Sequence, residues 1–182
     1  MATEYDDTSG FGIGGTAGWL VGGALGGVVG AAAFGLLMWA FDPDVIAAAI
    51  PAIYGLDPVG VVGWGIHAVH GLGLGLVFGF LVSRETVLGV LLTDAETEAL
   101  ARTGGMLRLV AAGFVYGLAI WAILPLLVLP VWAGTVGGTG GEFPTAAVES
   151  LLGHLLFGTV LGLVFAVTAD VSDYSGRRPL ED

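Results

Sequence analysis

The sequence predicts an all-α integral membrane protein, a four-helix bundle made of two tandem transmembrane hairpins. The chain has a mean hydropathy of +0.91. Of its 182 residues, 55% are hydrophobic and 12% are charged, whereas roughly a quarter of the residues of a soluble domain are charged. Four apolar stretches each reach the length of about 20 residues that a membrane-spanning helix requires. We therefore expect a single membrane domain over residues 1–182, surrounded by the lipid bilayer.

The four predicted transmembrane helices cover residues 14–41, 59–82, 109–132 and 146–169. The first three contain no Asp, Glu, Lys or Arg, and the fourth contains one acid, Glu149. The first two helices form repeat 1 (residues 14–85), and the last two form repeat 2 (residues 106–170).

The arginines predict how the helices are oriented. The chain has no lysine, and its five basic residues lie either between the second and third stretches or after the fourth. They are Arg84, Arg102, Arg108, Arg177 and Arg178. The loops 42–58 and 133–145 contain none. Since basic residues in short loops mark the cytoplasmic side, we expect a plasma-membrane protein with both termini, including the tail 171–182, in the cytoplasm.

Short elements are predicted in the loops. Thr93 followed by Glu96 is a capping-box pattern, so residues 93–104 should form a short cytoplasmic helix that ends at Gly104 and Gly105. Residues 45–50 precede Pro51 and suggest a short interfacial helix. Residues 134–142 are rich in glycine and are typical of a flexible linker.

The two halves of the chain align without gaps at an offset of 87 residues. His67 then matches His154, and the sequence Leu-Gly-Leu-Val-Phe at 74–78 matches the same five residues at 161–165. Each unit holds two spans, so both units have the same orientation. This arrangement is that of the parallel repeats in some transporters, related by an axis along the membrane normal.

Glycines recur every four residues along the predicted helices, as in a glycine zipper. Small residues at this spacing allow membrane helices to approach closely. The first helix carries such a ladder at Gly14, Gly18, Gly22, Gly26 and Gly30. His67 and His154 lie on similar ridges of the second and fourth helices, which places them toward another helix. The first helix is the expected partner of one of these two ridges.

His67 and His154 are the candidate site residues, because a histidine within a membrane helix suggests a function. Two histidines on facing helices can bind a haem b iron between them. Alternatively, each imidazole bonds a neighbouring carbonyl or side chain, or lies on a proton or substrate path. His70 stands three residues after His67, but no carboxylate shares its face. Glu149 lies at the end of the fourth helix, so these residues make a poor zinc site and no metal site is predicted.

The amino-acid composition excludes some classes of partner and of chemistry. The 16 acidic residues outnumber the 5 basic ones, so nucleic-acid binding is not expected. With no cysteine, thiolate chemistry is excluded. The acidic, lysine-free composition resembles that of haloarchaeal proteins, which are halophilic. The His-x3-Gly-x3-Gly pattern at 67–75 and 154–162 resembles that of small, uncharacterised multi-pass membrane families, and the resemblance implies no known activity.

The sequence favours a non-enzymatic membrane protein, such as a small structural subunit of a membrane assembly. Gly10, Gly12 and Gly15 match a dinucleotide-binding fingerprint, but they precede a membrane helix instead of following a strand. Two other functions remain open, a haem- or metal-binding redox protein using His67 and His154 and a small transporter or channel component. A homo-oligomer or a larger membrane complex is expected as the assembly.

Overall fold

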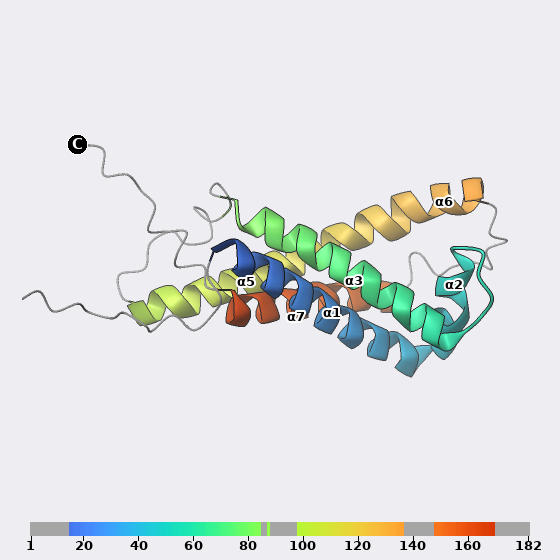
Figure 1. Cartoon of the computed structure of the whole chain (residues 1–182), viewed down its shortest axis with the longest axis horizontal. Coiled ribbons are helices and arrows are strands. Elements are labelled where there is room, and N and C mark those ends of the chain that lie inside the picture. Colours follow the sequence, from blue (N-terminus) through green and yellow to red (C-terminus); the bar gives the residue numbers. More distant parts are fainter. Residues whose placement is uncertain (1–14, 85–86, 88–97, 137–147, 170–182) are drawn as a thin grey trace, which may run out of the picture.

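The computed structural model describes residues 15–84, 87, 98–136 and 148–169. In these ranges the elements, drawn in Figure 1, are α1 Gly15–Phe41, η1 Val45–Ala49, α2 Ile50–Ala52, α3 Gly60–Val82, α5 Glu98–Ile123, η2 Leu124–Val128, α6 Leu129–Val136 and α7 Val148–Thr168, where η marks a π-helical turn. Four helical segments are long and apolar enough to cross a membrane: Ala17–Phe41, Gly60–Val82, Gly104–Trp132 and Val148–Thr168. The predicted all-α membrane bundle is confirmed.

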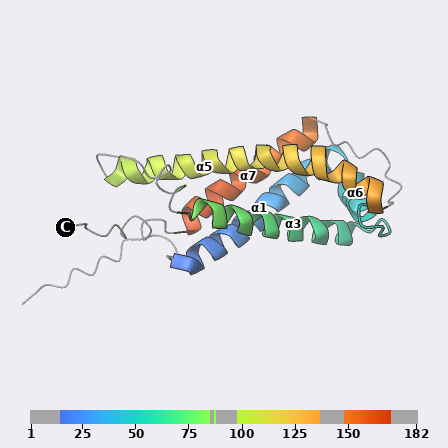
Figure 2. The same ribbon diagram turned by 90° about the horizontal axis from the view of Figure 1, so that it is seen from above.

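The helices are arranged in the order α3, α1, α7, α5. Helix α1 packs against both α3 and α7, and α7 packs against α1 and α5. Figure 2 shows α1 and α7 running side by side, with α3 crossing α1 and α5 crossing α7. We call α3 and α5 the flanking helices. The two inner helices therefore have close neighbours on two faces.

Glycines make these close approaches possible. A Cβ at Gly23 or Gly27 of α1 would meet the backbone of Gly75 or Gly71 of α3, and a Cβ at Gly113 of α5 would meet Gly158 of α7. The first helix is thus confirmed as the partner of the His67 ridge. The predicted glycine ladder of α1 faces α7 instead of α3. Its members Gly22, Gly26 and Gly30 lie against Phe165, Leu161 and Phe157 of α7.

The surface of the bundle is apolar, and its interior is made of small residues and aromatic rings. Phe78, Phe157, Leu161 and Phe165 form the core. On the outside, Val61 is 83% exposed and many other leucines and valines are exposed. In the described part of the chain no polar or charged residue is buried. This distribution suits a protein surrounded by lipid, where helices associate through backbone contact.

The two hairpins turn in different ways. Helix α1 ends at Phe41, where Asp42 accepts a hydrogen bond of 3.0 Å from the Asp44 amide, and η1 and α2 then fold back against α3. At the matching positions the second half has Leu129 and Val131, which offer no such bond. There the helix continues through η2 into α6. The predicted helix at 45–50 is confirmed, whereas residues 134–136, predicted as linker, are helical and 137–142 lie outside the described residues.

Both π-helical turns precede a proline at the same distance. The Ile50 amide bonds the Val45 carbonyl just before Pro51, and the Leu129 amide bonds the Leu124 carbonyl just before Pro130. A proline ring displaces the carbonyl of the preceding turn and removes a donor. Widening the turn accommodates the ring without ending the helix, and such turns are frequent at functional sites.

The predicted end of the short helix at 93–104 is wrong. Helix α5 begins in the described residues at Glu98 and passes through Gly104 and Gly105 without interruption. Glycine costs only about 1 kcal/mol relative to alanine inside a helix, and the strongly apolar segment that follows outweighs it. Residues 93–97 and the tail 171–182 lie outside the described residues.

Candidate functional site: a pocket between the two flanking helices

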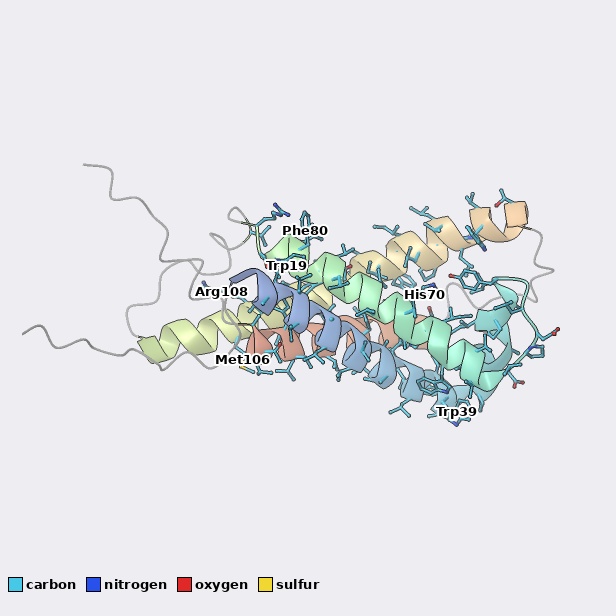
Figure 3. All side chains as sticks on the ribbon, in the orientation of Figure 1. Trp19, Trp39, His70, Phe80, Met106 and Arg108 are labelled. Carbon is cyan, nitrogen blue, oxygen red and sulfur yellow. The ribbon has the colours of Figure 1, made fainter. Side chains whose placement is uncertain are left out.

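A pocket of about 850 Å³ lies at the end of the bundle that carries η1, α2 and α6, which we call the α2 end. Arg84 follows α3 at the opposite end, and Figure 3 shows Arg108, Trp19 and Phe80 toward that end as well. The pocket walls come from α1, α3, α7, the two π-helical turns and α6. Its apolar lining includes Ala31, Phe34, Met38, Val45, Ile50, Leu74, Leu124, Pro125, Val128, Leu129 and Phe157.

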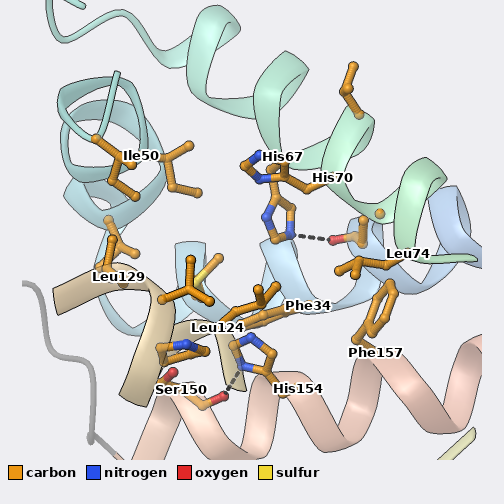
Figure 4. A pocket seen from close by; sticks show the side chains of 18 of the residues that line it. Phe34, Ile50, His67, His70, Leu74, Leu124, Leu129, Ser150, His154 and Phe157 are labelled. Atoms are coloured by element: carbon orange, nitrogen blue, oxygen red, sulfur yellow. Dashed lines mark hydrogen bonds between the residues drawn. The ribbon is translucent and has the colours of Figure 1, made fainter. Parts of the chain in front are cut away.

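Both predicted histidines line this pocket. Figure 4 shows the His67 ring descending from α3 and the His154 ring rising from α7, with Phe34 of α1 between them. The ring centroid of Phe34 lies 5.3 Å from that of His67 and 4.7 Å from that of His154. The aligned histidines of the two halves thus meet the same phenyl ring.

Each imidazole has one nitrogen bonded to a backbone carbonyl. His67 Nε2 donates to the Ala31 oxygen at 3.0 Å, across the interface between α3 and α1. His154 Nδ1 donates to the Ser150 oxygen at 2.7 Å, within its own helix. The carbonyl bonds account for one nitrogen of each ring and leave the other nitrogen on the side of the pocket.

The floor of the pocket is closed where α3 and α5 are tied together by a side chain. The Tyr116 hydroxyl of α5 donates to the Leu74 carbonyl of α3 at 2.8 Å. Its ring lies 5.3 Å from the Phe78 ring, which in turn lies 5.6 Å from Phe165. Beyond this layer, toward the α2 end, the flanking helices diverge and enclose the pocket.

The rim is formed by the segment after α2 and by α6. Tyr54 bonds His70 Nε2 at 2.6 Å, and the Trp132 indole donates to the Ile53 carbonyl at 2.8 Å. Burial raises the pKa of the Tyr54 hydroxyl above its ordinary value of 10.0, so this group stays protonated and can donate. The described acids of the lining, Asp42 and Glu149, are also at this rim.

Sequence analysis identified the histidines but not the residues that surround them. Phe34, Tyr54 and Trp132 were not predicted as site residues. Trp132 was interpreted as an interfacial anchor, since a tryptophan near a helix end is typical of a membrane interface. The two prolines, Pro51 and Pro130, were the available signal, since each follows a widened turn that lines the pocket.

The described residues do not form a compact metal site. Within them, no group of three or more His, Asp or Glu side chains could hold a metal ion. His67 and His70 are neighbours on α3, but Tyr54 occupies Nε2 of His70. The polar groups of the pocket are spread around an apolar wall.

No family model, curated protein or solved structure matches this chain. The function of the pocket must therefore be inferred from its own residues.

Proposed function

We propose that this multi-pass membrane protein binds a mainly apolar small molecule in the pocket, as a non-enzymatic binding protein or as a subunit of a larger membrane assembly. Binding pockets for small molecules measure about 300–1,000 Å³ and combine apolar walls with a few placed polar groups. The observation that carries the proposal is the pocket of about 850 Å³, which is lined by apolar side chains and has His67 and His154 directed into it.

The place of the pocket suggests how a ligand enters. Helix α3 packs on α1, and α5 packs on α7. The pocket lies between α3 and the continuation of α5 through η2 and α6. Near the α2 end, the described contacts between these two walls include those of Trp132 and Tyr54 at the rim. The arginine distribution supports an orientation with this end toward the outside. We infer entry from the outer half of the bilayer.

A haem bound between His67 and His154 fits this geometry less well. The Phe34 ring, 7% exposed, fills the space between the two imidazoles. The Nε2 atom of His67 is also engaged by the Ala31 carbonyl. A ligand lying beside the rings, along the apolar wall of η2 and α6, requires neither contact to break.

Two glycines of α3 provide a matched test. Gly73 lines the pocket and Gly65 does not, and a Cβ added at either would meet nothing within 4 Å. Gly73→Leu therefore adds bulk at a residue that lines the pocket, whereas Gly65→Leu adds the same bulk at a residue of the same helix that does not line it. Both changes raise helix propensity equally.

Native mass spectrometry after mild extraction from membranes measures the outcome. The wild type and Gly65→Leu should retain one small-molecule adduct, and Gly73→Leu should lose most of it. Equal retention by all three proteins, or adducts that are only randomly distributed bulk lipids, would contradict the proposed function.

A further inference from the structure

The hydrogen bonds of the two histidines determine which of their atoms face a ligand. A backbone carbonyl can only accept, so the nitrogen that bonds it must carry the proton. This nitrogen is Nε2 in His67, bonded to Ala31, and Nδ1 in His154, bonded to Ser150. In a neutral imidazole the second nitrogen is then an acceptor. Each ring therefore offers the pocket an acceptor nitrogen, Nδ1 of His67 and Nε2 of His154.

These two acceptors have no partner among the described residues. The donors of the lining, in contrast, are largely used within the protein. The Trp132 indole donates to Ile53, and the Tyr54 hydroxyl is paired with His70. Ser150 retains a hydroxyl, which rotates and can donate or accept, and His70, whose Nε2 accepts from Tyr54, keeps one donor at Nδ1. The acceptors His67 Nδ1 and His154 Nε2 and the carboxylates of Asp42 and Glu149 outnumber these donors. The described lining thus has a surplus of acceptors.

The charged residues of the lining also favour a ligand whose head is a donor over one whose head is anionic. Asp42 and Glu149 line the rim, and none of the described lining residues is Arg or Lys. An anionic head group would find no cationic partner and would be repelled by the two carboxylates. Phosphate and carboxylate heads are therefore disfavoured at this site.

We infer that the pocket selects an apolar molecule whose head is a hydrogen-bond donor, such as a hydroxyl or an amine, over one whose head only accepts or is anionic. This inference rests on the proposed function and specifies its ligand class. The donor would bond Nε2 of His154, Nδ1 of His67 or both, while the chain lies against Leu124, Val128 and Leu129. A site with unpaired acceptors discriminates strongly against an analogue that lacks the matching donor.

Four probes of equal chain length test the selection on the whole chain: a long-chain alcohol, its methyl ether, the corresponding primary amine and the corresponding carboxylic acid. Affinities are measured by native mass spectrometry and by the thermal stabilisation that each probe produces, since a ligand of the folded state raises stability. One hydrogen bond to an otherwise unpaired acceptor should favour the alcohol over the ether by about tenfold. The amine of the same length should bind at least as well as the alcohol, and the acid should bind no better than the ether.

The variant His154→Phe retains a ring beside Phe34 but removes the acceptor. Since Nδ1 of His67 remains as a second acceptor, the variant should reduce the preference for the alcohol over the ether, whereas a merely structural role of His154 would lower the affinity for both probes equally. An equal loss for alcohol and ether would overturn the inference. If the variant does not fold, the wild-type comparison of the probes still decides.

The outcomes also separate this inference from the proposed function. If the wild type binds alcohol, ether and acid equally well, donor selection is wrong and the binding function stands. If none of the probes binds, and Gly73→Leu likewise changes nothing, both are wrong.

Discussion

The Phe34 ring lies between the imidazoles of His67 and His154, where a metal ion or a haem iron would otherwise bridge them. This ring is held from below by Gly153 of α7, where a Cβ would overlap the phenyl ring. The glycine before His154 therefore allows α7 to approach α1 closely enough for all three rings to meet. Sequence analysis placed both histidines on helix-facing ridges, but it could not place Phe34 between them, because that depends on which face of α1 meets α7.

A substitution at Tyr116 tests how much one hydrogen bond between α5 and α3 contributes to stability. Its hydroxyl donates to the Leu74 carbonyl and connects α5 to α3 beneath the pocket. Interhelical hydrogen bonds in membranes contribute about 0.6 kcal/mol on average and up to about 1.7 kcal/mol. Tyr116→Phe should therefore lower the free energy of unfolding by about this amount, measured by thermal or denaturant unfolding in detergent.

The matched change Tyr54→Phe should have a smaller effect, because Tyr54 is exposed at the rim and water can replace its bond to His70. If Tyr116→Phe proved as stable as the wild type, the tie between α3 and α5 would not contribute to the fold.

At the scale of elements, the number of glycine faces on a helix corresponds to the number of its close neighbours. Helix α1 uses Gly23 and Gly27 toward α3 and a second set toward α7, whereas α5 uses Gly113 and Gly117 toward α7 alone. The lengths and order of the four spans could be predicted from hydropathy. The order in which the helices pack could not be predicted, because the ladder at every fourth residue indicated one face of α1, whereas the face toward α3 carries fewer glycines, Gly23 and Gly27.

Alanine substitutions at one glycine of α1 and one glycine of α5 distinguish the effect of close helix packing on stability from the effect of helix propensity. A Cβ at Gly27 would collide with the Gly71 backbone, whereas one at Gly104 of α5 would meet nothing within 4 Å. Both changes gain about 1 kcal/mol in helix propensity. We expect Gly104→Ala to maintain or raise the unfolding temperature and Gly27→Ala to lower it, because α1 and α3 must move apart. Equal, stabilising effects would show that α1 and α3 are not in close contact.

At the scale of the whole molecule, the pocket results from the unequal turns of the two hairpins. Segments η1 and α2 fold back to one side of it, while η2 and α6 continue upward on the other. The gapless alignment of the halves requires outer loops of equal length, and no cavity between them was predicted from the sequence. Asp42 and Asp44 in the first half, against Leu129 and Val131 in the second, account for the difference. Superposition of the two halves as equivalent hairpins stays a prediction.

The membrane orientation connects the fold to the proposed function, because it decides whether the pocket opens to the outer half of the bilayer. Asp57 lies in the exposed segment after α2 at the rim end. Thr97 and Thr139, outside the described residues, belong to the loop between the second and third spans and to the loop between the third and fourth spans. The arginines predict that Thr97 faces the cytoplasm and that the other two positions face outward.

Single cysteines at these three positions, in a chain that has no cysteine of its own, can be labelled with a membrane-impermeant thiol reagent in intact cells. We predict that Asp57→Cys and Thr139→Cys react in intact cells, and that Thr97→Cys reacts only after the membrane is permeabilised. Labelling of Thr97→Cys together with the other two in intact cells would contradict the four-span topology. Labelling of Thr97→Cys alone would place the pocket at the cytoplasmic side and contradict entry from the outer half of the bilayer.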